Sequence, residues 1–380
     1  MIAPVDKISV FYRDILAGTL QTDPSTGVCA FEYSDGWLAN GFSLSPTELP
    51  LQPGLIYAEG GKFGGNFAIF EDSLPDGYGL YLLNRLLKEK GTSLKELTPL
   101  QRLSIIGTSG MGALSYIPVM RGFPSQREVQ EELELDILQE EALKALSEKE
   151  PADASLLYYN SGNSGGARPK AAMVTHEGMH FLIKFRHVFD PQDIGKTELL
   201  YMTTARECGV SIPRVGLVKG KYFAIERFDI GPGGERYHMA SAAALLKTDF
   251  RNQDVDYTNL LALTGYLTQD PVQVEEMFLR MVVNLVAVNK DDHAKNFSFL
   301  CKKGIWSLAP AYDITYSPAG SNGEHATSLF YKGNPGLDLV IKAGTQIRIP
   351  EKRCLEIVHT VEEVCQKRLP VVNLLSKRLF

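Results

Sequence analysis

The chain has 380 residues, of which 44% are hydrophobic and 22% charged, and its formal net charge is −6. This length predicts two domains or lobes, and this composition is typical of an ordinary soluble globular protein. The acidic balance gives no support for a protein that binds nucleic acid through its bulk charge.

The cysteines and the apolar runs exclude several further classes of protein. The five cysteines are scattered and form no CxxC pair, so we expect neither a disulfide framework nor a zinc site. A reducing cytoplasm fits this usage best. We find no signal peptide and no apolar run near the roughly 20 residues that span a bilayer, so no membrane contact is expected.

The first 120 residues are predicted to form an N-terminal module. Residues 7–60 alternate short β-rich runs with turn residues, which predicts a small sheet. Leucines at i, i+3 and i+4 spacing predict a helix over about 80–90, and a short helix is expected at 98–105. The glycine-rich run 107–114 has the spacing of no known phosphate or nucleophile loop, so we interpret it as a tight turn.

The remaining chain is predicted to change from β-rich to helical. Residues 126–150 are expected to be an acidic helix whose buried stripe is Val129, Leu133 and Ile137. The expected elements after it are strands at 171–174, 180–185, 213–218 and 222–226, and helices at 196–208, 272–288, 351–366 and 370–378. This order predicts a two-lobed α+β protein with a cleft between its lobes.

One short stretch, NKDDHAKNFS at 289–298, gathers polar groups that are costly to bury without partners. We interpret Asp291 as the base that accepts a proton from a hydroxyl during phosphoryl transfer. Asn296 and Asp313 carry the amide and carboxylate oxygens that Mg²⁺ prefers. Protein kinases show an Asp, an Asn about five residues later and a further Asp in this order. The alternative, a solvated turn, does not account for the combined pattern.

Two neighbours in the same stretch have less certain roles. Lys295 is expected to help neutralise charge on the transferred phosphoryl group. A lone histidine such as His293 is more often a structural hydrogen-bonding residue, and we place it only at the edge of the nucleotide site.

Lysine and glycine residues upstream supply candidates for phosphate binding. Lys184 lies on a predicted strand, as does the kinase lysine that holds the α- and β-phosphates, and Glu198 is the nearest candidate partner for it. Backbone N–H groups of the glycine-rich segment 161–170 can cradle phosphate oxygens, and Arg168 and Lys170 add positive charge. The alternatives are a solvent-facing strand lysine and a linker. Residues 226–228 end a strand where a hinge would contact adenine, although charged residues at strand ends are usually surface residues.

These residues together resemble the HipA-type serine/threonine kinase family, whose members are toxins of type II toxin–antitoxin pairs. The similarity covers most of the chain. It is carried by FYRDILAGTL, SLPDGYG, IIGTSGMGALSYIP, SGGARPK, FLIKF, ERFD, NKDDHAKNFS and APAYDI. The last two motifs, at this spacing, are highly specific.

The resemblance implies a protein-kinase-like fold and a set of roles. It implies a HipA N-terminal-like module at 1–120, a helical connection at 121–150, a kinase N-lobe at 151–240 and a helical C-lobe at 241–380. The implied cofactors are ATP and Mg²⁺. Asp291 would be the catalytic base, assisted by Lys295, and the metal ligands would be Asn296 and Asp313. The implied nucleotide contacts are Gly165, Gly166, Ala167, Arg168, Lys170, Lys184, Glu226, Arg227, Phe228 and His293. An autophosphorylated serine is also implied, for which Ser161 and Ser164 are the candidates.

The family further implies a protein substrate, which is glutamyl-tRNA synthetase for its best-known members, and a HipB-like helix-turn-helix antitoxin. Contact with DNA would then be indirect, through that antitoxin. Two alternatives stay open from the residues alone. One is a small-molecule kinase of the aminoglycoside phosphotransferase type, which shares the Asp, Asn and Asp pattern. The other is a catalytically silent nucleotide-binding regulator.

Overall fold

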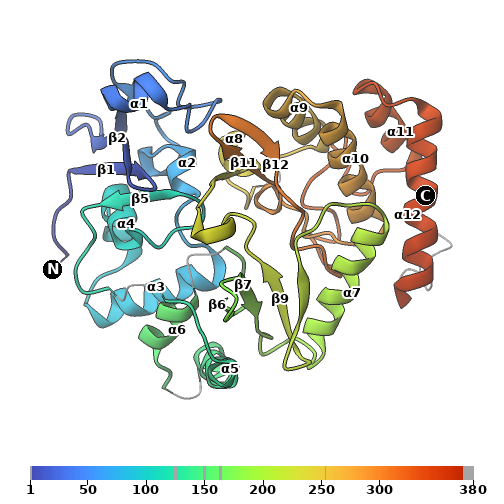
Figure 1. Ribbon diagram of the computed structural model, residues 1–380, viewed down its shortest axis with the longest axis horizontal. Coiled ribbons are helices and arrows are strands. Elements are labelled where there is room, and N and C mark those ends of the chain that lie inside the picture. Colours follow the sequence, from blue (N-terminus) through green and yellow to red (C-terminus); the bar gives the residue numbers. More distant parts are fainter. Residues whose placement is uncertain (1, 124–126, 149–150, 162–164, 253, 371–380) are drawn as a thin grey trace. The chain divides into compact units, whose positions relative to one another are not determined.

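A computed structural model describes residues 2–123, 127–148, 151–161, 165–252 and 254–370 (Figure 1). The chain is a mixed α/β protein that divides into two compact units. Unit 1 comprises Met1–Gly195, Leu217–Ala240 and Cys301–Gly304, and unit 2 comprises Lys196–Gly216, Ser241–Leu300 and Ile305–Phe380. Among the described residues, every helix is too short or too polar to cross a membrane.

The first sheet of unit 1 is the small sheet predicted for the N-terminal residues. Its strand order is β4-β3-β2-β1-β5, with all four pairings antiparallel. Alternate residues of β1 (Ile8, Val10 and Tyr12) are buried, as expected for a strand with one face in the core. The strands are β1 (Lys7–Tyr12), β2 (Ile15–Thr22), β3 (Cys29–Tyr33), β4 (Ile56–Tyr57) and β5 (Leu114–Ile117).

The helices of this part of unit 1 confirm the leucine patterns. In α3 (Gly77–Glu89) the buried residues include Leu82, Leu83, Leu86 and Leu87. The short helix α4 (Pro99–Ile106) begins with a capping box between Thr98 and Gln101 and with proline at its first position. The run 107–114 is the turn between α4 and β5, as predicted. The smaller helices are α1 (Asp35–Asn40), η1 (Phe63–Gly65), α2 (Ala68–Glu71) and η2 (Leu94–Glu96).

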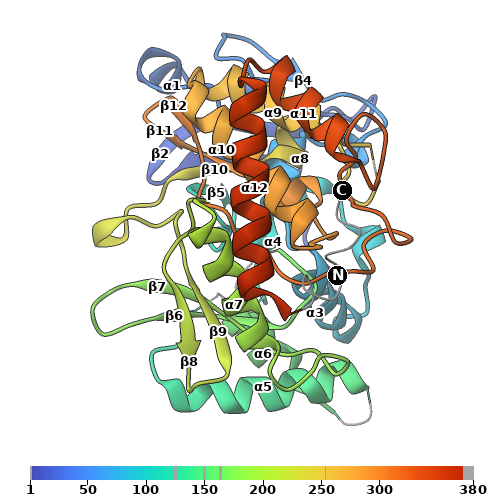
Figure 2. The same ribbon diagram turned by 90° about the vertical axis from the view of Figure 1, so that its right-hand side faces the viewer.

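The second sheet has the order β6-β7-β9-β8, and β6-β7 and β7-β9 are antiparallel. Its strands are β6 (Lys170–Val174), β7 (His180–Lys184), β8 (Val215–Val218) and β9 (Tyr222–Glu226), close to the predicted ranges. Ala171, Ile183 and Ala224 project from one face into a core that α3, α5 (Glu132–Ser147) and α6 (Ala154–Ser161) also line. Figure 2 shows α5 beside the β8–β9 turn, where Lys219 and Lys221 pair with Asp136.

The prediction of a helix from residue 126 was wrong at its start, and one residue of its buried stripe was wrong. Val129 is extended and forms a bridge with Met173, because its N–H donates to the carbonyl of Ala172 at 2.8 Å. The helix begins at Glu132, and Ile137 is 58% exposed. The buried face of α5 instead carries Leu135, Leu138, Ala142 and Ala145. Val129 is therefore buried as an extended residue beside β6 and not as part of the helix.

Unit 2 contains most of the predicted helices. In it, α10 packs on α9 and α12, and α11 packs on α12, the long helix that Figure 2 shows clearly. The helices are α7 (Ile194–Glu207), which starts in unit 1, α8 (Ala242–Leu245), α9 (Tyr257–Thr268), α10 (Pro271–Val286), η4 (Ala294–Asn296), α11 (Leu337–Gln346) and α12 (Glu351–Arg368). The helix predicted at 370–378 lies almost entirely outside the described residues.

The second half of the chain is less helical than predicted, because it contains a third sheet of order β10-β11-β12. These strands are β10 (His238–Ser241), β11 (Ser298–Lys302) and β12 (Ile305–Leu308), with η3 (Pro232–Gly234) just before them. The turn of the β11–β12 hairpin contains Lys303 and Gly304, both at positive φ. Four- and five-residue strands carry little periodic signal, which is why the apolar runs beside the turn gave no prediction.

His238 gives unit 1 a pH dependence that can be measured. Its side chain is fully buried, and Nε2 lies 2.7 Å from the carbonyl oxygen of Leu44. Burial lowers the pKa of His238 to about 4. Between about pH 6.5 and 4 the unfolded chain therefore binds a proton here that the folded chain does not.

We predict that this histidine lowers the free energy of unfolding as the pH falls from 6.5 to 4, by roughly 3 kcal/mol in total. Thermal melts at pH 7.5 and 5 should show a smaller pH-dependent loss for His238→Gln than for the wild type. His176, which is exposed, supplies the control, and His176→Gln should keep the wild-type dependence. An unchanged pH dependence in His238→Gln would contradict the prediction.

Candidate functional site

The predicted site residues fall into two sets, one in each unit, and each set is described within its own unit. Unit 1 holds the glycine loop, Lys184 and residues 226–228, whereas unit 2 holds residues 291–296 and Asp313. Glu198 lies on α7 in unit 2 and is buried. Ser161 is buried at the end of α6 with its hydroxyl 3.3 Å from the carbonyl of Tyr158, whereas Ser164 lies outside the described residues.

The glycine loop of unit 1 is held by the start of α3. The N–H of Gly166 donates to a carboxylate oxygen of Asp76, and the N–H of Tyr78 donates to the carbonyl of Gly166 at 3.0 Å. Gly77 lies between them at φ 43°, and a Cβ there would collide with the carbonyl of Gly166. Gly165 and Ala167 are exposed. Sequence reasoning missed Asp76, because no local pattern links it to a loop ninety residues away.

Lys170 and Lys184 occupy directly opposite positions in the β6–β7 pair. Side chains at such positions lie on one face of the sheet with Cβ atoms about 5 Å apart, where like charges destabilise. The Lys170 ammonium donates to the carbonyl of Gly165, and the Lys184 ammonium lies 5.5 Å from the centre of the Phe223 ring. The sheet therefore concentrates two positive charges next to the glycine loop, an arrangement that favours an anion.

A third cation near the glycine loop, Arg168, has a carboxylate partner. Arg168 makes a bidentate pair with Asp190, with its two nitrogens 3.0 and 3.3 Å from the carboxylate oxygens. The guanidinium of Arg168 therefore bonds to the Asp190 carboxylate, and a bound phosphate would share it with that carboxylate. Lys184 also borders a cavity of about 220 Å³ whose lining includes Arg186 and Lys221.

Residues 226–228 continue from β9. The N–H of Arg227 donates to the carbonyl of His180 at 2.9 Å, which extends the ladder by one residue beyond Glu226. The guanidinium of Arg227 is bidentate to Asp229, at 3.0 and 2.6 Å. Burial alone would raise the pKa of the Asp229 carboxyl, but Arg227 and the Gly112 N–H hold it below its usual value. The side chain of Arg227 therefore belongs to a buried ion pair, and Phe228 follows directly after it.

The loop that carries Asp291 in unit 2 is anchored at its start. After α10, the N–H of Lys290 donates to the carbonyl of Ser317 at 3.0 Å, and the N–H of Ala326 donates to the carbonyl of Lys290 at 3.0 Å. The Asn289 amide donates to the Asn284 side chain at 2.9 Å and lies 3.4 Å from the carbonyl of Asp313. These bonds connect the loop to the segment that contains Asp313.

Asp291 and Asn296 are close neighbours on this loop. The side chain of Asp291 is 65% exposed, so its carboxylate can reach a substrate. The Asn296 amide nitrogen donates to the backbone carbonyl of Asp291 at 2.7 Å. That bond fixes the orientation of the amide and leaves its oxygen directed to the other side, where it can serve as a ligand for a hard cation.

The segment that contains Asp313 is hydrogen-bonded to the same loop through Tyr312. The hydroxyl of Tyr312 donates to the carbonyl of Lys295 at 2.6 Å and lies 2.5 Å from the hydroxyl of Ser298. Asp313 itself has φ 55°, a left-handed conformation that is uncommon for residues other than glycine. Such conformations cluster at functional sites, where the surroundings impose them. Within unit 2, the bonds of Tyr312 and of the Asp313 carbonyl therefore hold the segment of Asp313 to the loop that carries Asp291 and Asn296.

Their donor set fits Mg²⁺ bound together with phosphate. In the described ranges, no group of three or more His, Cys, Asp or Glu side chains is arranged to hold a metal ion. A dedicated protein cage is not what Mg²⁺ needs, because it usually takes one or two carboxylates and completes its shell with water and substrate phosphates. One carboxylate from Asp313 and one amide oxygen from Asn296 match that pattern.

His293 and Lys295 share an aromatic neighbour. The ring of His293 lies 5.1 Å from that of Phe250, and the Lys295 ammonium lies 5.0 Å from the centre of the same Phe250 ring. The His293 Nε2 is 4.0 Å from a carboxylate oxygen of Asp291. Phe250 was missed in the sequence, because an isolated aromatic residue in a loop gives no indication of what it contacts.

Asp292 has a different environment from Asp291. It is fully buried, and its Oδ2 accepts a hydrogen bond from Tyr257 at 2.6 Å and lies 2.9 Å from His325 Nδ1. Its other oxygen accepts from the N–H of Thr327 at 3.3 Å, and the Thr327 hydroxyl donates to its carbonyl at 2.5 Å. Asn284 in turn donates to the Tyr257 hydroxyl at 3.0 Å. The sequence alone did not reveal these partners, which lie up to 35 residues away.

Comparison with known proteins identifies relatives of this chain. A HipA N-terminal domain matches residues 8–117 and a HipA-like C-terminal domain matches residues 162–369. No curated protein sequence matches the chain. The structure of the Shewanella oneidensis MR-1 toxin–antitoxin system, HipA with HipB and operator DNA, aligns with TM-score 0.71 at 19% identity, over 97% of this chain and 91% of that chain. This likeness confirms that the chain has the fold of HipA, as the resemblance predicted.

A weaker likeness is found to the Helicobacter pylori proinflammatory kinase CtkA. It has TM-score 0.34 at 12% identity and covers 55% of this chain and 94% of that chain. A likeness at this level carries no argument about the fold or the chemistry.

The adjacent residues Asp291 and Asp292 make a matched pair of variants. We predict that Asp292→Ala lowers the free energy of unfolding by about 3 kcal/mol or more, because Tyr257, His325 and Thr327 would lose their buried acceptor. Asp291→Ala should change stability little, because its side chain is mostly exposed. Chemical unfolding of both variants measures the difference. Equal stability of the two would show that the buried carboxylate does not hold the loop.

Proposed function

Because this chain belongs to the HipA family, we propose that it transfers a phosphoryl group from ATP to serine or threonine of a protein. The observation that supports the proposal is the loop of unit 2, where hydrogen bonds hold Asn296 and the Tyr312–Asp313 segment to the backbone of the loop that presents the exposed carboxylate of Asp291. Phosphoryl transfer depends mainly on positioning and charge stabilisation, and these are what the described residues can supply.

The proposed roles follow from the chemistry of each side chain. Asp291 orients the attacking hydroxyl and accepts its proton. Asn296 and Asp313 would hold Mg²⁺, which supplies charge neutralisation at the phosphates. Lys295, beside the same loop, adds positive charge for the transferred group. Asp292 holds the loop in place through its buried partners.

The nucleotide contacts are proposed for unit 1. Lys184 and Lys170 would bind phosphate oxygens, and the backbone of Gly165, Gly166 and Ala167 would cover them, with charge from Arg168. In the structure Gly166 and Lys170 bond to Asp76 and the Gly165 carbonyl, so phosphate would replace these partners. The remaining contacts are proposed for the adenine side, from the Glu226, Arg227 and Phe228 backbone, and for His293.

The biological role is proposed from the family. We expect a toxin whose partner is a HipB-like helix-turn-helix antitoxin, with DNA contacted indirectly through it, in the cytoplasm. The expected substrate is a translation-related protein resembling glutamyl-tRNA synthetase. Autophosphorylation is proposed at Ser164 or Ser161. For Ser161 the buried hydroxyl would first have to become accessible.

Phosphoryl transfer itself can be tested with labelled ATP and cell extract. We predict label on a protein band with the wild type, and a loss of about 10²- to 10⁴-fold in rate for Asp291→Asn, the usual contribution of a general base. Asp338→Asn, at an exposed carboxylate of unit 2, is the control and should keep the wild-type rate. Label on small molecules alone would favour a small-molecule kinase. No transfer at all would favour a silent nucleotide-binding regulator.

Nucleotide binding can be tested separately by calorimetric titration with ATP. Lys184→Met should weaken binding by about tenfold or more, because a charge-assisted bond to phosphate is worth roughly 1.5 to 3 kcal/mol. Lys352→Met, whose side chain is 92% exposed on α12, should bind as the wild type does. In the Asn296→Ala, Asp313→Ala double variant, affinity should no longer rise with Mg²⁺. A metal dependence that persists there would contradict the proposed ligands.

A further inference from the structure

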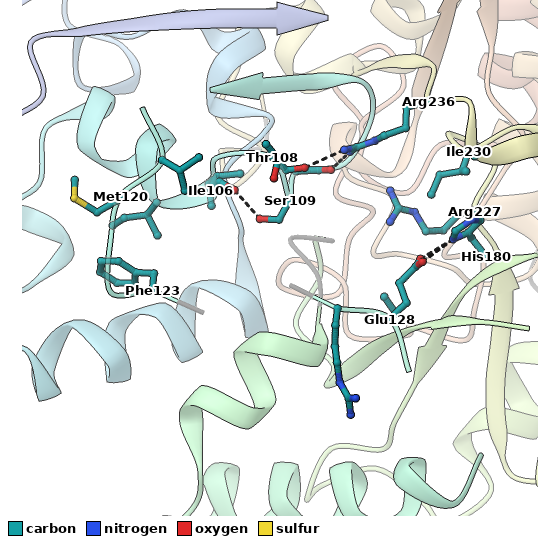
Figure 3. A pocket seen from close by; sticks show the side chains of 16 residues that line it. Ile106, Thr108, Ser109, Met120, Phe123, Glu128, His180, Arg227, Ile230 and Arg236 are labelled. Atoms are coloured by element: carbon teal, nitrogen blue, oxygen red, sulfur yellow. Dashed lines mark hydrogen bonds and ion pairs between the residues drawn. The ribbon is translucent and has the colours of Figure 1, made fainter. Parts of the chain in front are cut away.

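Unit 1 contains a cavity of about 380 Å³ that the proposed phosphoryl transfer does not use (Figure 3). One side is formed by the end of α4 and by residues around the turn 107–123, and the other by β6, β7 and the segment 227–236. All of its lining residues belong to unit 1. Its volume lies within the roughly 300–1,000 Å³ of small-molecule sites and would hold about a dozen waters.

The charged groups of the cavity lie together at one end. Figure 3 shows Arg227, Arg236, His180 and Glu128 on the same side, with Thr108 next to Arg236, whereas the Ser109 hydroxyl donates to the carbonyl of Ile106 on the other side. Two of these basic side chains have a carboxylate partner. Arg227 is paired with Asp229 at 2.6 Å, and His180 Nδ1 lies 2.7 Å from a carboxylate oxygen of Glu128.

Arg236 is compensated differently. In the part of the chain that the structure describes, its guanidinium donates to the backbone carbonyls of Thr108, at 3.0 Å, and Gly110. Its Nε is buried and has no hydrogen-bond partner among the described residues. Burial and the charge of Arg227 lower the pKa of the Arg236 guanidinium, although the arginine stays protonated. This end of the cavity therefore holds one cation that no directly bonded carboxylate neutralises.

The opposite end of the cavity is apolar. Figure 3 shows Ile106, Met120 and Phe123 there, away from the arginines, and Val119, which is 47% exposed, also lines the cavity. A purely polar ligand would leave these apolar side chains in contact with water, whereas a purely apolar ligand would leave Arg236 without an anion. The two ends together favour a ligand that has an anionic group at one end and an apolar body at the other.

We infer that this cavity binds a small amphipathic monoanion, whose carboxylate or phosphodiester group lies at Arg236 and Arg227 and whose compact apolar body packs on Ile106, Met120 and Phe123. Arg236 sets the preference for one negative charge, because its directly bonded acceptors among the described residues are backbone carbonyls rather than carboxylates. A planar guanidinium suits either a carboxylate or a phosphate oxygen pair. The inference does not depend on the proposed kinase activity, because none of the proposed catalytic or metal residues lines the cavity and Arg227 is proposed to contact adenine only through its backbone.

Calorimetric titration of the full chain tests the inference with three probes that share a phenyl ring. Methyl phenyl phosphate and benzoate carry the two candidate monoanions, and benzyl alcohol carries no charge. We expect saturable binding in a one-to-one ratio for at least one anion, at least tenfold tighter than for benzyl alcohol, and unchanged by saturating ATP. The tighter of the two anions identifies the head group.

Two variants and a control locate the site. Arg236→Gln should weaken anion binding at least tenfold. Because Arg236 also holds the carbonyls of Thr108 and Gly110, Val119→Glu provides a second variant that adds a negative charge at an exposed lining position and should have the same effect. Arg251→Gln, at an exposed arginine of unit 2, should bind as the wild type does.

Several results would overturn the inference. They are the absence of saturable binding by either anion, equal affinity for benzyl alcohol, displacement of the probe by ATP, or unchanged affinity in Val119→Glu. Should Arg236→Gln fail to fold, the result from Val119→Glu decides.

Discussion

The buried carboxylate of Asp292 is the constraint on which the proposed site depends. A charge with no exposure to solvent is tolerated only when its lone pairs are taken up, and here Tyr257, His325 and Thr327 do so. Tyr257 belongs to α9, and His325 and Thr327 belong to the segment after Asp313. The hydrogen bonds therefore hold the loop to α9 and to that segment. The preceding residue, Asp291, is thereby presented to solvent on a fixed backbone. The two adjacent aspartates thus have different roles: Asp292 anchors the loop, and Asp291 is exposed for the proposed chemistry.

Unit 1 has a comparable feature in the cross-strand pair of Lys170 and Lys184. Ammonium groups directly opposite each other on a sheet repel, and the phosphate proposed to bind there would offset that repulsion. Asp313, in unit 2, has a left-handed conformation of the kind that clusters at functional sites. The two lysines belong to the proposed nucleotide contacts of unit 1, and Asp313 belongs to the proposed metal ligands of unit 2. Arg236, to which no carboxylate bonds directly among the described residues, lines a separate cavity of unit 1.

The candidate catalytic loop could be proposed from the sequence because its residues are close together. Asp291 and Asn296 are five residues apart, and the residue types and spacing of these two residues and Asp313 predict phosphoryl transfer. The roles of Asp76 and Phe250 could not be predicted, because they depend on contacts that only the folded chain creates. The start of the helix predicted over 126–150 was wrong for the same reason, since pairing of Val129 with the β6 edge overrode its local helical pattern. Helices with long apolar periodicity, such as α3 and α10, were predicted well.

The central claim is that Asp291 drives phosphoryl transfer from ATP to protein hydroxyl groups. The most direct measurement is the intact mass of the purified chain, wild type and Asp291→Asn, after expression alone and after incubation with Mg·ATP. The account predicts that the wild type gains phosphate on serine and that Asp291→Asn gains none. Equal phosphate on both proteins would contradict it, as would a wild type that phosphorylates neither itself nor any protein in an extract.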